Sequence, residues 1–208
     1  MEGQHQPRSR QRPHPSRGRT PRPQQRGRND YATHRVGVGE TKSACPDAVT
    51  RPRGDSPAFI CVAVSRQELA DLFDGKTIDS KIGFTPNQAL LDAVDIDESG
   101  GEEAERAALM MASIYALTRY GERLVMTGTL PRTSLTESAE ECHNGAVRLA
   151  SVNLTGMESW FDDELPQLAR QAASLTLGDS IDDAWNKPIV QKLMEESDLL
   201  WHDITERL

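Results

Sequence analysis

An acidic stretch in the middle of the chain imitates the start of a calcium-binding loop. Asp95, Asp97 and Ser99 occupy the first, third and fifth places of such a loop, and Gly100 occupies the sixth. The twelfth place, which should hold a bidentate glutamate, is Arg106. Because that carboxylate is missing, the sequence predicts no calcium site. The same residues are typical of an acidic loop that precedes a helix, since the helix dipole favours anions at its N-terminus.

Cys142 and His202 have the residue types of a nucleophile and its general base. A thiol becomes a good nucleophile only when a base lies within hydrogen-bond reach. The two residues are far apart in the sequence, and no motif places them together. A third candidate, His143, lies in a polar stretch beside Cys142. We therefore expect both histidines to be surface groups, and we assign no catalytic residue.

Six carboxylates near the C-terminus have the chemistry for acid–base catalysis or metal binding. They are Asp162, Asp163, Glu164, Asp179, Asp182 and Asp183. A solvated acidic face is the simpler interpretation, so the sequence predicts neither a metal site nor a cofactor. It also predicts no phosphate-binding loop, because Gly100, Gly101 and Gly128 lack the spacing and the strand-to-helix setting of one.

The three cysteines, Cys45, Cys61 and Cys142, are widely spaced and odd in number. This pattern predicts neither a disulfide framework nor a zinc site, and it is typical of a reducing compartment. Cys61 lies in an apolar run, where we expect it to pack rather than react. No apolar run reaches the length of a signal-peptide core or a membrane span. We predict a cytoplasmic protein that does not contact a membrane.

Charge divides the chain into two parts. Residues 1–55 contain 12 basic and 5 acidic residues, a net charge of +7. The whole chain carries −8, so residues 56–208 carry −15. The basic part is rich in Arg, Pro, Gln and Gly and has few large apolar side chains, so burial cannot offset the entropy of ordering it. We predict a disordered arm over residues 1–55 and a single folded domain over residues 56–208.

Several interpretations of the basic arm remain open. Its arginines have the charge to neutralise nucleic-acid phosphates. A solvated tail is the interpretation we favour, because no aromatic residue for base stacking precedes Tyr31. The composition also resembles translated leader DNA. Since the acidic domain repels phosphates, nucleic-acid binding is predicted only through residues 1–55.

The folded part is organised around a long helix and the strand that follows it. Apolar residues recur at helical spacing from Ala104 to Leu117, and Gly121 follows as a left-handed cap. Residues 123–130 then alternate between two faces, which predicts a strand with one buried face that ends at Pro131.

The remaining segments predict a sequence of further strands and helices. Strands are predicted over residues 59–64, 146–154, 157–161 and 199–204. A helix is the alternative for residues 199–204. Residues 157–161 are expected to pair back on residues 146–154. Helices are predicted after the capping box of Ser65 and Glu68, after Thr85, after Asp162 or Asp163, and near Pro188. Ile78, Ile82 and Phe84 are assigned to a connector, and residues 131–145 to a polar loop.

This order of elements predicts an α+β fold. We expect a two-layer domain with a mostly antiparallel sheet of four to five strands and helices on one face. A split βαβ (ferredoxin-like) arrangement is one topology that fits the order.

Several of these segments together resemble an uncharacterised family of small actinobacterial proteins. They are residues 59–69, 84–86, 102–117, 123–131 and 199–201, with Thr205 and Glu206 near the end. The resemblance covers residues 59–208 and excludes the arm. It implies a fold unit in a cytosolic bacterial protein. The family has no assigned activity, so the resemblance implies no functional residue.

The sequence therefore favours a non-catalytic interaction or regulatory module with an unknown protein partner. One alternative is a small enzyme that uses the acidic residues or the histidines. Another is nucleic-acid binding through the Arg-rich arm.

Overall fold

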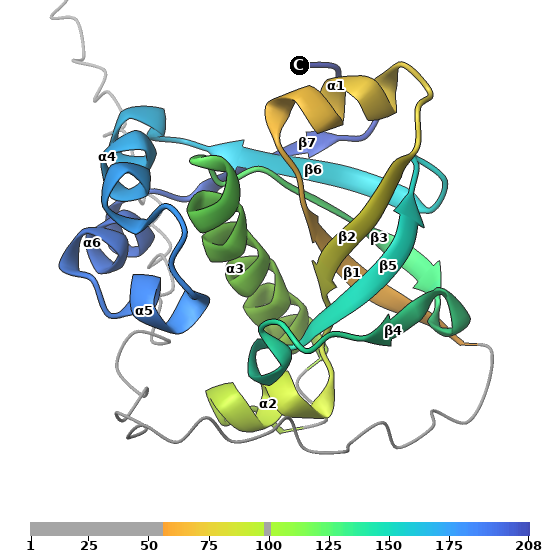
Figure 1. Ribbon diagram of the computed structural model, residues 1–208, viewed down its shortest axis with the longest axis horizontal. Helices are drawn as coiled ribbons and strands as arrows, with labels where there is room; N and C mark the ends of the chain where they lie inside the picture. The colour runs from red at the N-terminus through yellow and green to blue at the C-terminus, as the bar shows by residue number, and fades with distance from the viewer. Residues whose placement is uncertain (1–55, 98–100) are drawn as a thin grey trace, which may run out of the picture.

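The computed structural model describes residues 56–97 and 101–208 and gives them an α+β fold (Figure 1). The predicted arm lies outside the described residues. The strands are β1 (Pro57–Ala63), β2 (Ile78–Phe84), β3 (Val125–Pro131), β4 (Leu135–Glu137), β5 (Ala146–Val152), β6 (Met157–Asp163) and β7 (Leu199–Asp203). The helices are α1 (Arg66–Phe73), α2 (Gln88–Val94), α3 (Gly101–Tyr120), α4 (Pro166–Thr176), α5 (Ile181–Trp185) and α6 (Pro188–Glu196), with short 3-10 turns η2 (Arg132–Ser134) and η3 (Cys142–Asn144). Among the described helices, none is long and apolar enough to cross a membrane.

One open antiparallel sheet holds the seven described strands in the order β4-β5-β2-β1-β3-β6-β7. The expected count of four to five strands is wrong, because β2 and β4 do not follow the expected pattern. In β2, the buried Lys81 interrupts the apolar run. Gly83 also replaces a large side chain there, since a Cβ atom would lie 2.8 Å from Ile60 Cδ1 and from Leu149 Cδ1. The edge strand β4 has only three residues, too few to show alternation.

The topology contains one split βαβ unit but not the ferredoxin-like order. Strands β2 and β3 both run antiparallel to β1, which lies between them, and α2 and α3 connect them. However, β1 and β2, which α1 connects, are antiparallel neighbours. The predicted hairpin between β5 and β6 is also wrong, because β6 pairs with β3 and β7 instead.

The capping box predicted at the start of α1 is confirmed. The backbone N–H of Glu68 donates to Ser65 Oγ at 3.2 Å, and the backbone N–H of Ser65 donates to Glu68 Oε2 at 2.8 Å. The cap predicted for α2, Thr85, is wrong. Asn87 caps the helix, since its Oδ1 accepts the N–H of Leu90, whereas Thr85 Oγ1 donates to the carbonyl of Phe59.

Helix α4 begins without the predicted aspartate cap. Leu165 occupies the cap position, whereas Asp162 and Asp163 belong to β6. The short acidic segment before α6 is itself a helix, α5, which Ser180 caps.

Helices cover both faces of the sheet, so the expectation of helices on one face is wrong. On one face, α1 contributes Leu69 and Leu72 to a core with Ile60, Val62 and Trp160. On the other face, α2, α3 and α5 enclose a second core, and α4 and α6 pack on the end of α3 (Figure 1). Both faces of β3 are therefore buried, rather than the one predicted.

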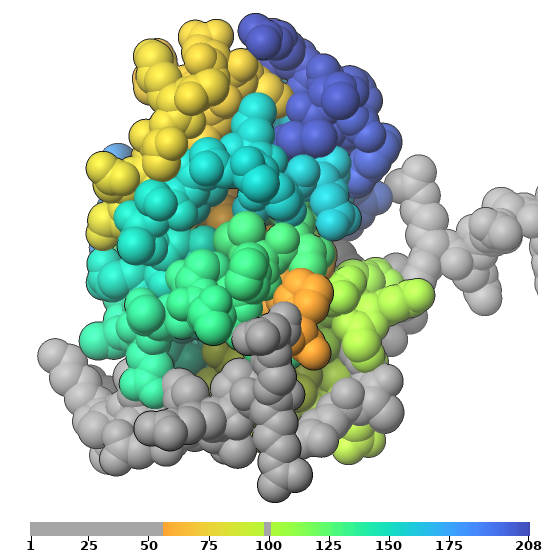
Figure 2. Space-filling view, turned by 90° about the vertical axis from the view of Figure 1, so that its right-hand side faces the viewer, coloured from red at the N-terminus to blue at the C-terminus, as the bar shows by residue number. Residues whose placement is uncertain are grey.

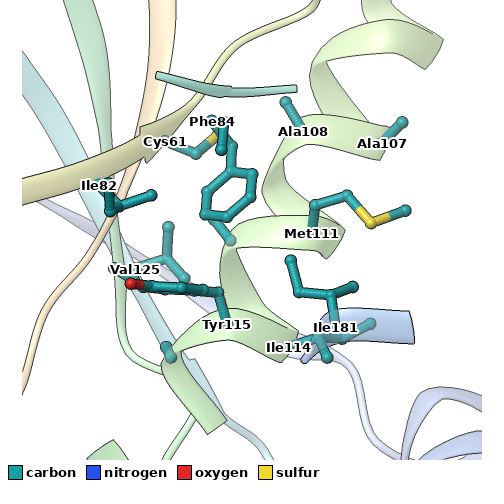
Figure 3. Packing of buried hydrophobic residues seen from close by; sticks show 14 of the residues in the cluster. Cys61, Ile82, Phe84, Ala107, Ala108, Met111, Ile114, Tyr115, Val125 and Ile181 are labelled. Atoms are coloured by element: carbon teal, nitrogen blue, oxygen red, sulfur yellow. The ribbon is translucent and has the colours of Figure 1, made fainter. Parts of the chain in front are cut away.

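The core under α3 consists of small residues on the helix and large residues around them (Figure 3). Ala107, Ala108 and Met111 on α3 are almost fully buried. Phe84 and Tyr115 meet with their ring centroids 5.4 Å apart. The alanines allow α3 to approach the sheet closely, which explains why the long helix is the centre of the domain.

This packing gives a prediction for α3. Ala108→Leu should overpack the core and lower the free energy of unfolding by about 1–3 kcal/mol. Met111→Ala should lower it by about 2–5 kcal/mol, because the shortened side chain leaves a cavity. Arg106→Ala, on the exposed face of the same helix, is the matched control and should change it little. Urea denaturation measures all three, and equal small effects would contradict the assignment of the buried face.

Candidate interaction edge

Strand β7 lies at one end of the sheet, so one of its backbone edges has no neighbouring strand among the described residues. Its pairing with β6 sets which residues face outward. Glu164 N–H donates to the Asp198 carbonyl, and Ile204 N–H donates to the Glu158 carbonyl. Hydrogen-bonded and non-hydrogen-bonded pairs alternate in an antiparallel ladder. The even-numbered residues of β7 therefore bond to β6, and the odd-numbered ones turn their N–H and C=O groups outward.

The outward edge is open at one end of β7 and closed at the other. Leu199 and Trp201 present their backbone groups without a protein partner in the described part of the chain. Asp203 N–H, by contrast, donates to Glu206 Oε1 at 3.1 Å. The C-terminal turn thus limits the free edge to a short segment, as natural sheets do to prevent uncontrolled strand pairing.

Two large apolar side chains accompany this free backbone. Trp201 is 58% exposed and Leu200 is 44% exposed, on opposite faces of the strand. Residues near the C-terminus form part of the surface beside α1 in Figure 2. The other two tryptophans, Trp160 and Trp185, are buried at 3% and 5% exposure. Trp201 is therefore the one tryptophan of the three whose side chain is mostly exposed to solvent.

Neighbouring residues hold β7 firmly against β6. The His202 ring stacks on Trp160 with the centroids 3.9 Å apart and an interplanar angle of 11°. His202 Nε2 lies 3.0 Å from Asp162 Oδ1, and Trp160 Nε1 donates to the Glu206 carbonyl at 2.9 Å. The edge is therefore preorganised, which lowers the entropic cost of binding another chain.

The structure does not bring Cys142 and His202 together. Cys142 lies in η3, directly before β5, whereas His202 lies on β7, and four strands separate β5 from β7. Cys142 is also disulfide-bonded, which the sequence analysis did not expect. Cys61 packs in the core as predicted, and burial raises the pKa of its thiol well above the usual value. Neither residue therefore offers an accessible free thiol.

The acidic candidate residues are spread over several elements rather than gathered in one site. Asp162 contacts His202, Asp163 pairs with Arg123, and Asp179 lies 2.6 Å from Lys187 Nζ. Asp182 and Asp183 lie in the first turn of α5. In residues 56–97 and 101–208 no cluster of three or more His, Cys, Asp or Glu side chains is arranged to hold a metal ion. Of the calcium-like loop, Asp95 and Asp97 are described, but Ser99 and Gly100 lie outside the described residues.

A buried ion pair that the sequence analysis missed joins the sheet to the C-terminal helices. Arg123 Nε donates to Asp163 Oδ1 at 2.5 Å, and Arg123 Nη2 donates to Ser197 Oγ and to its carbonyl, each at 3.0 Å. Burial lowers the pKa of Arg123 and raises that of Asp163, while their mutual attraction opposes both shifts. The sequence predicted only that Arg123 lies on one face of a strand. It could not predict the ion pair, because Asp163 is distant in the sequence.

A second buried cation, Lys81 on β2, contacts α1. Its Nζ donates to both carboxylate oxygens of Glu68, at 3.0 and 2.9 Å, and to Tyr120 Oη at 2.6 Å. Burial of Glu68 acts to raise its pKa, but the Ser65 backbone N–H and Lys81 outweigh this effect, so the pKa is lowered. All three polar groups have partners, so the burial of Lys81 leaves no charge uncompensated.

A pocket of about 530 Å³ lies between the N-terminus of α1, the C-terminus of α3 and α4. Its carboxylates are already engaged, because Glu122 pairs with Arg66, Asp162 with His202 and Asp163 with Arg123. The lining contains three arginines and three carboxylates, so its charges largely neutralise one another.

No family model, curated protein or solved structure matches this chain. The resemblance to an actinobacterial family therefore stays a prediction.

Proposed function

We propose that the domain is a non-catalytic interaction module that binds an extended protein segment along β7. The observation that carries this proposal is the outward edge of β7, where free backbone groups lie beside the exposed side chains of Leu200 and Trp201. In strand addition, backbone hydrogen bonds provide affinity and alternate side chains provide specificity. β7 offers both within one short segment.

The residues that could do chemistry are not gathered in one place. The buried ion pairs of Arg123 and Lys81 are satisfied within the domain, and Cys142 in η3 lies far from His202 on β7. Nothing described favours the alternative of a small enzyme over this proposal. Nucleic-acid binding through residues 1–55 and the cytoplasmic setting remain predictions.

Peptide selection tests this proposal on the full chain. Random peptides of about ten residues are selected on the wild-type protein. The affinity of each labelled peptide for every variant is measured by fluorescence anisotropy of the label, and on the wild-type protein tryptophan fluorescence and acrylamide quenching locate the binding. Because Trp160 and Trp185 are buried, quenching reports mainly on Trp201. We expect a bound peptide to shield Trp201 and reduce quenching.

Two variants separate the side-chain and backbone contributions. Trp201→Ser removes the side chain, and Trp201→Pro also removes the outward N–H, which an edge strand tolerates. We expect the first variant to weaken binding at least tenfold and the second to weaken it further. Leu177→Lys, at a similarly exposed leucine after α4, is the control and should bind normally. Selected peptides that bind all four proteins equally would rule out β7 as the site.

A further inference from the structure

We infer that the segment that binds β7 is β7 of a second copy of this chain, paired antiparallel about a twofold axis at Trp201. This inference rests on the proposed function and names the partner of the same edge. The two sheets would then join into one continuous sheet.

The sequence of β7 is self-complementary in this register. Trp201 lies opposite Trp201 of the second copy, Leu199 opposite Asp203, and Leu200 opposite His202. No two residues of like charge lie opposite each other within β7, which matters because such pairs destabilise a strand pair. A twofold contact of this kind is closed, so it uses the free edge of both copies and leaves none for further growth.

The backbone groups match the same register. Because Trp201 faces outward, the two Trp201 residues would exchange N–H···O=C hydrogen bonds across the axis. Both backbone groups of Asp203 are engaged in the C-terminal turn, because its N–H donates to Glu206 Oε1 and its carbonyl accepts the backbone N–H of Glu206. The hydrogen bonds between the two copies are therefore centred on the Trp201 pair, and pairing ends before Asp203.

The side chains add apolar contact at the centre. The two Trp201 rings would meet on the face that also carries Phe161, the β6 partner of Trp201. On the opposite face, each Leu200 would pack beside His202 of the second copy, whose ring is fixed by its stacking on Trp160. The exposed apolar groups of β7 are therefore covered on both faces.

The net charge gives this dimer a distinctive salt dependence. Each chain carries −8, so two copies repel each other at low ionic strength. Added salt screens this repulsion and should strengthen the dimer. A basic strand from a different partner would show the opposite dependence, because salt would weaken its attraction to the acidic domain.

Analytical ultracentrifugation of the full chain over a range of concentrations and salt tests the inference. We expect the mass to rise from 23.0 kDa towards twice that value with concentration, and at lower concentration when salt is added. Trp201→Lys places two like charges opposite each other and should raise the dissociation constant at least tenfold. Leu177→Lys should leave it within about twofold, and circular dichroism should show that both variants are folded.

Cysteine cross-linking tests the register. In an antiparallel hydrogen-bonded pair the Cα atoms are about 5.5 Å apart, which suits a disulfide. Trp201→Cys should therefore form a cross-linked dimer on mild oxidation. Asp203→Cys should not, because the two copies of residue 203 would lie about 13 Å apart along the strands. The wild-type chain is oxidised in parallel to account for its own cysteines.

The outcomes distinguish this inference from the proposed function. A chain that stays monomeric, but whose selected peptides still depend on Trp201, overturns the second copy as partner and keeps β7 as a binding edge. A dimer that Trp201→Lys does not weaken overturns the inference. If the chain stays monomeric and the selected peptides bind equally well without Trp201, both the inference and the proposed function are overturned.

Discussion

Replacing Asp163 with alanine should destabilise the domain by about 3–5 kcal/mol, because it leaves the buried guanidinium of Arg123 without its counter-ion. Arg123 is 2% exposed and also donates to Ser197, at the end of α6. The pair thus connects the segment before β3 and the end of β6 to the C-terminal helices, so its loss affects several elements at once. Urea denaturation followed by circular dichroism measures the effect.

The neighbouring residue gives a matched control for this variant. Asp162→Ala removes a carboxylate from the same strand, but its partner His202 is partly solvated. Exposed pairs of this kind contribute about 0–1 kcal/mol. If Asp162→Ala and Asp163→Ala cost the same, the buried pair does not hold the sheet and the C-terminal helices together.

Replacing Gly128 with alanine should lower the free energy of unfolding by about 3 kcal/mol or more, at or beyond the upper end of ordinary overpacking. A Cβ atom at Gly128 would lie 2.1 Å from the carbonyl oxygen of Gly156 and 2.6 Å from Met157 Cα. Both obstacles are backbone atoms, so no side chain can rotate away. The register of β3 against β6 shifts at this point, and this close approach allows the two strands to pair.

Gly101→Ala is the control for the Gly128 substitution. No atom lies within 4 Å of a Cβ built at Gly101, which opens α3. Since alanine favours a helix over glycine, the thermal midpoint of Gly101→Ala should stay constant or rise. A midpoint for Gly128→Ala as high as that of Gly101→Ala would show that the strands can separate locally without cost.

The elements that the sequence predicted correctly are those that local physics specifies. The capping box of Ser65 and Glu68 and the left-handed Gly121 after α3 depend on residues within a few positions of each other. The apolar periodicity of α3 and the apolar run of β1 likewise reflect burial along a single element. The edge strand β7 also follows from its own residues, although a helix was the alternative.

Other elements needed tertiary information. Strand β2 was assigned to a connector, because Lys81 and Gly83 interrupt its apolar pattern. Lys81 is tolerated there only because Glu68 and Tyr120 satisfy its charge and its hydrogen bonds. Gly83 is needed because Ile60 and Leu149 fill the space above it. These partners are distant in sequence, so the local pattern alone does not contain the reason for the strand.

The sequence by itself determined the α+β class and the long helix, and it favoured a strand over a helix at residues 199–204. Only the tertiary structure decided that β6 pairs with β3 rather than β5, that Asp163 neutralises Arg123, and that β7 lies at an edge with Trp201 exposed. The physical reason is that helix caps and apolar periodicity arise from contacts between near neighbours. Strand order and ion pairing arise from contacts between distant residues, and many arrangements of the same elements satisfy the local rules equally well.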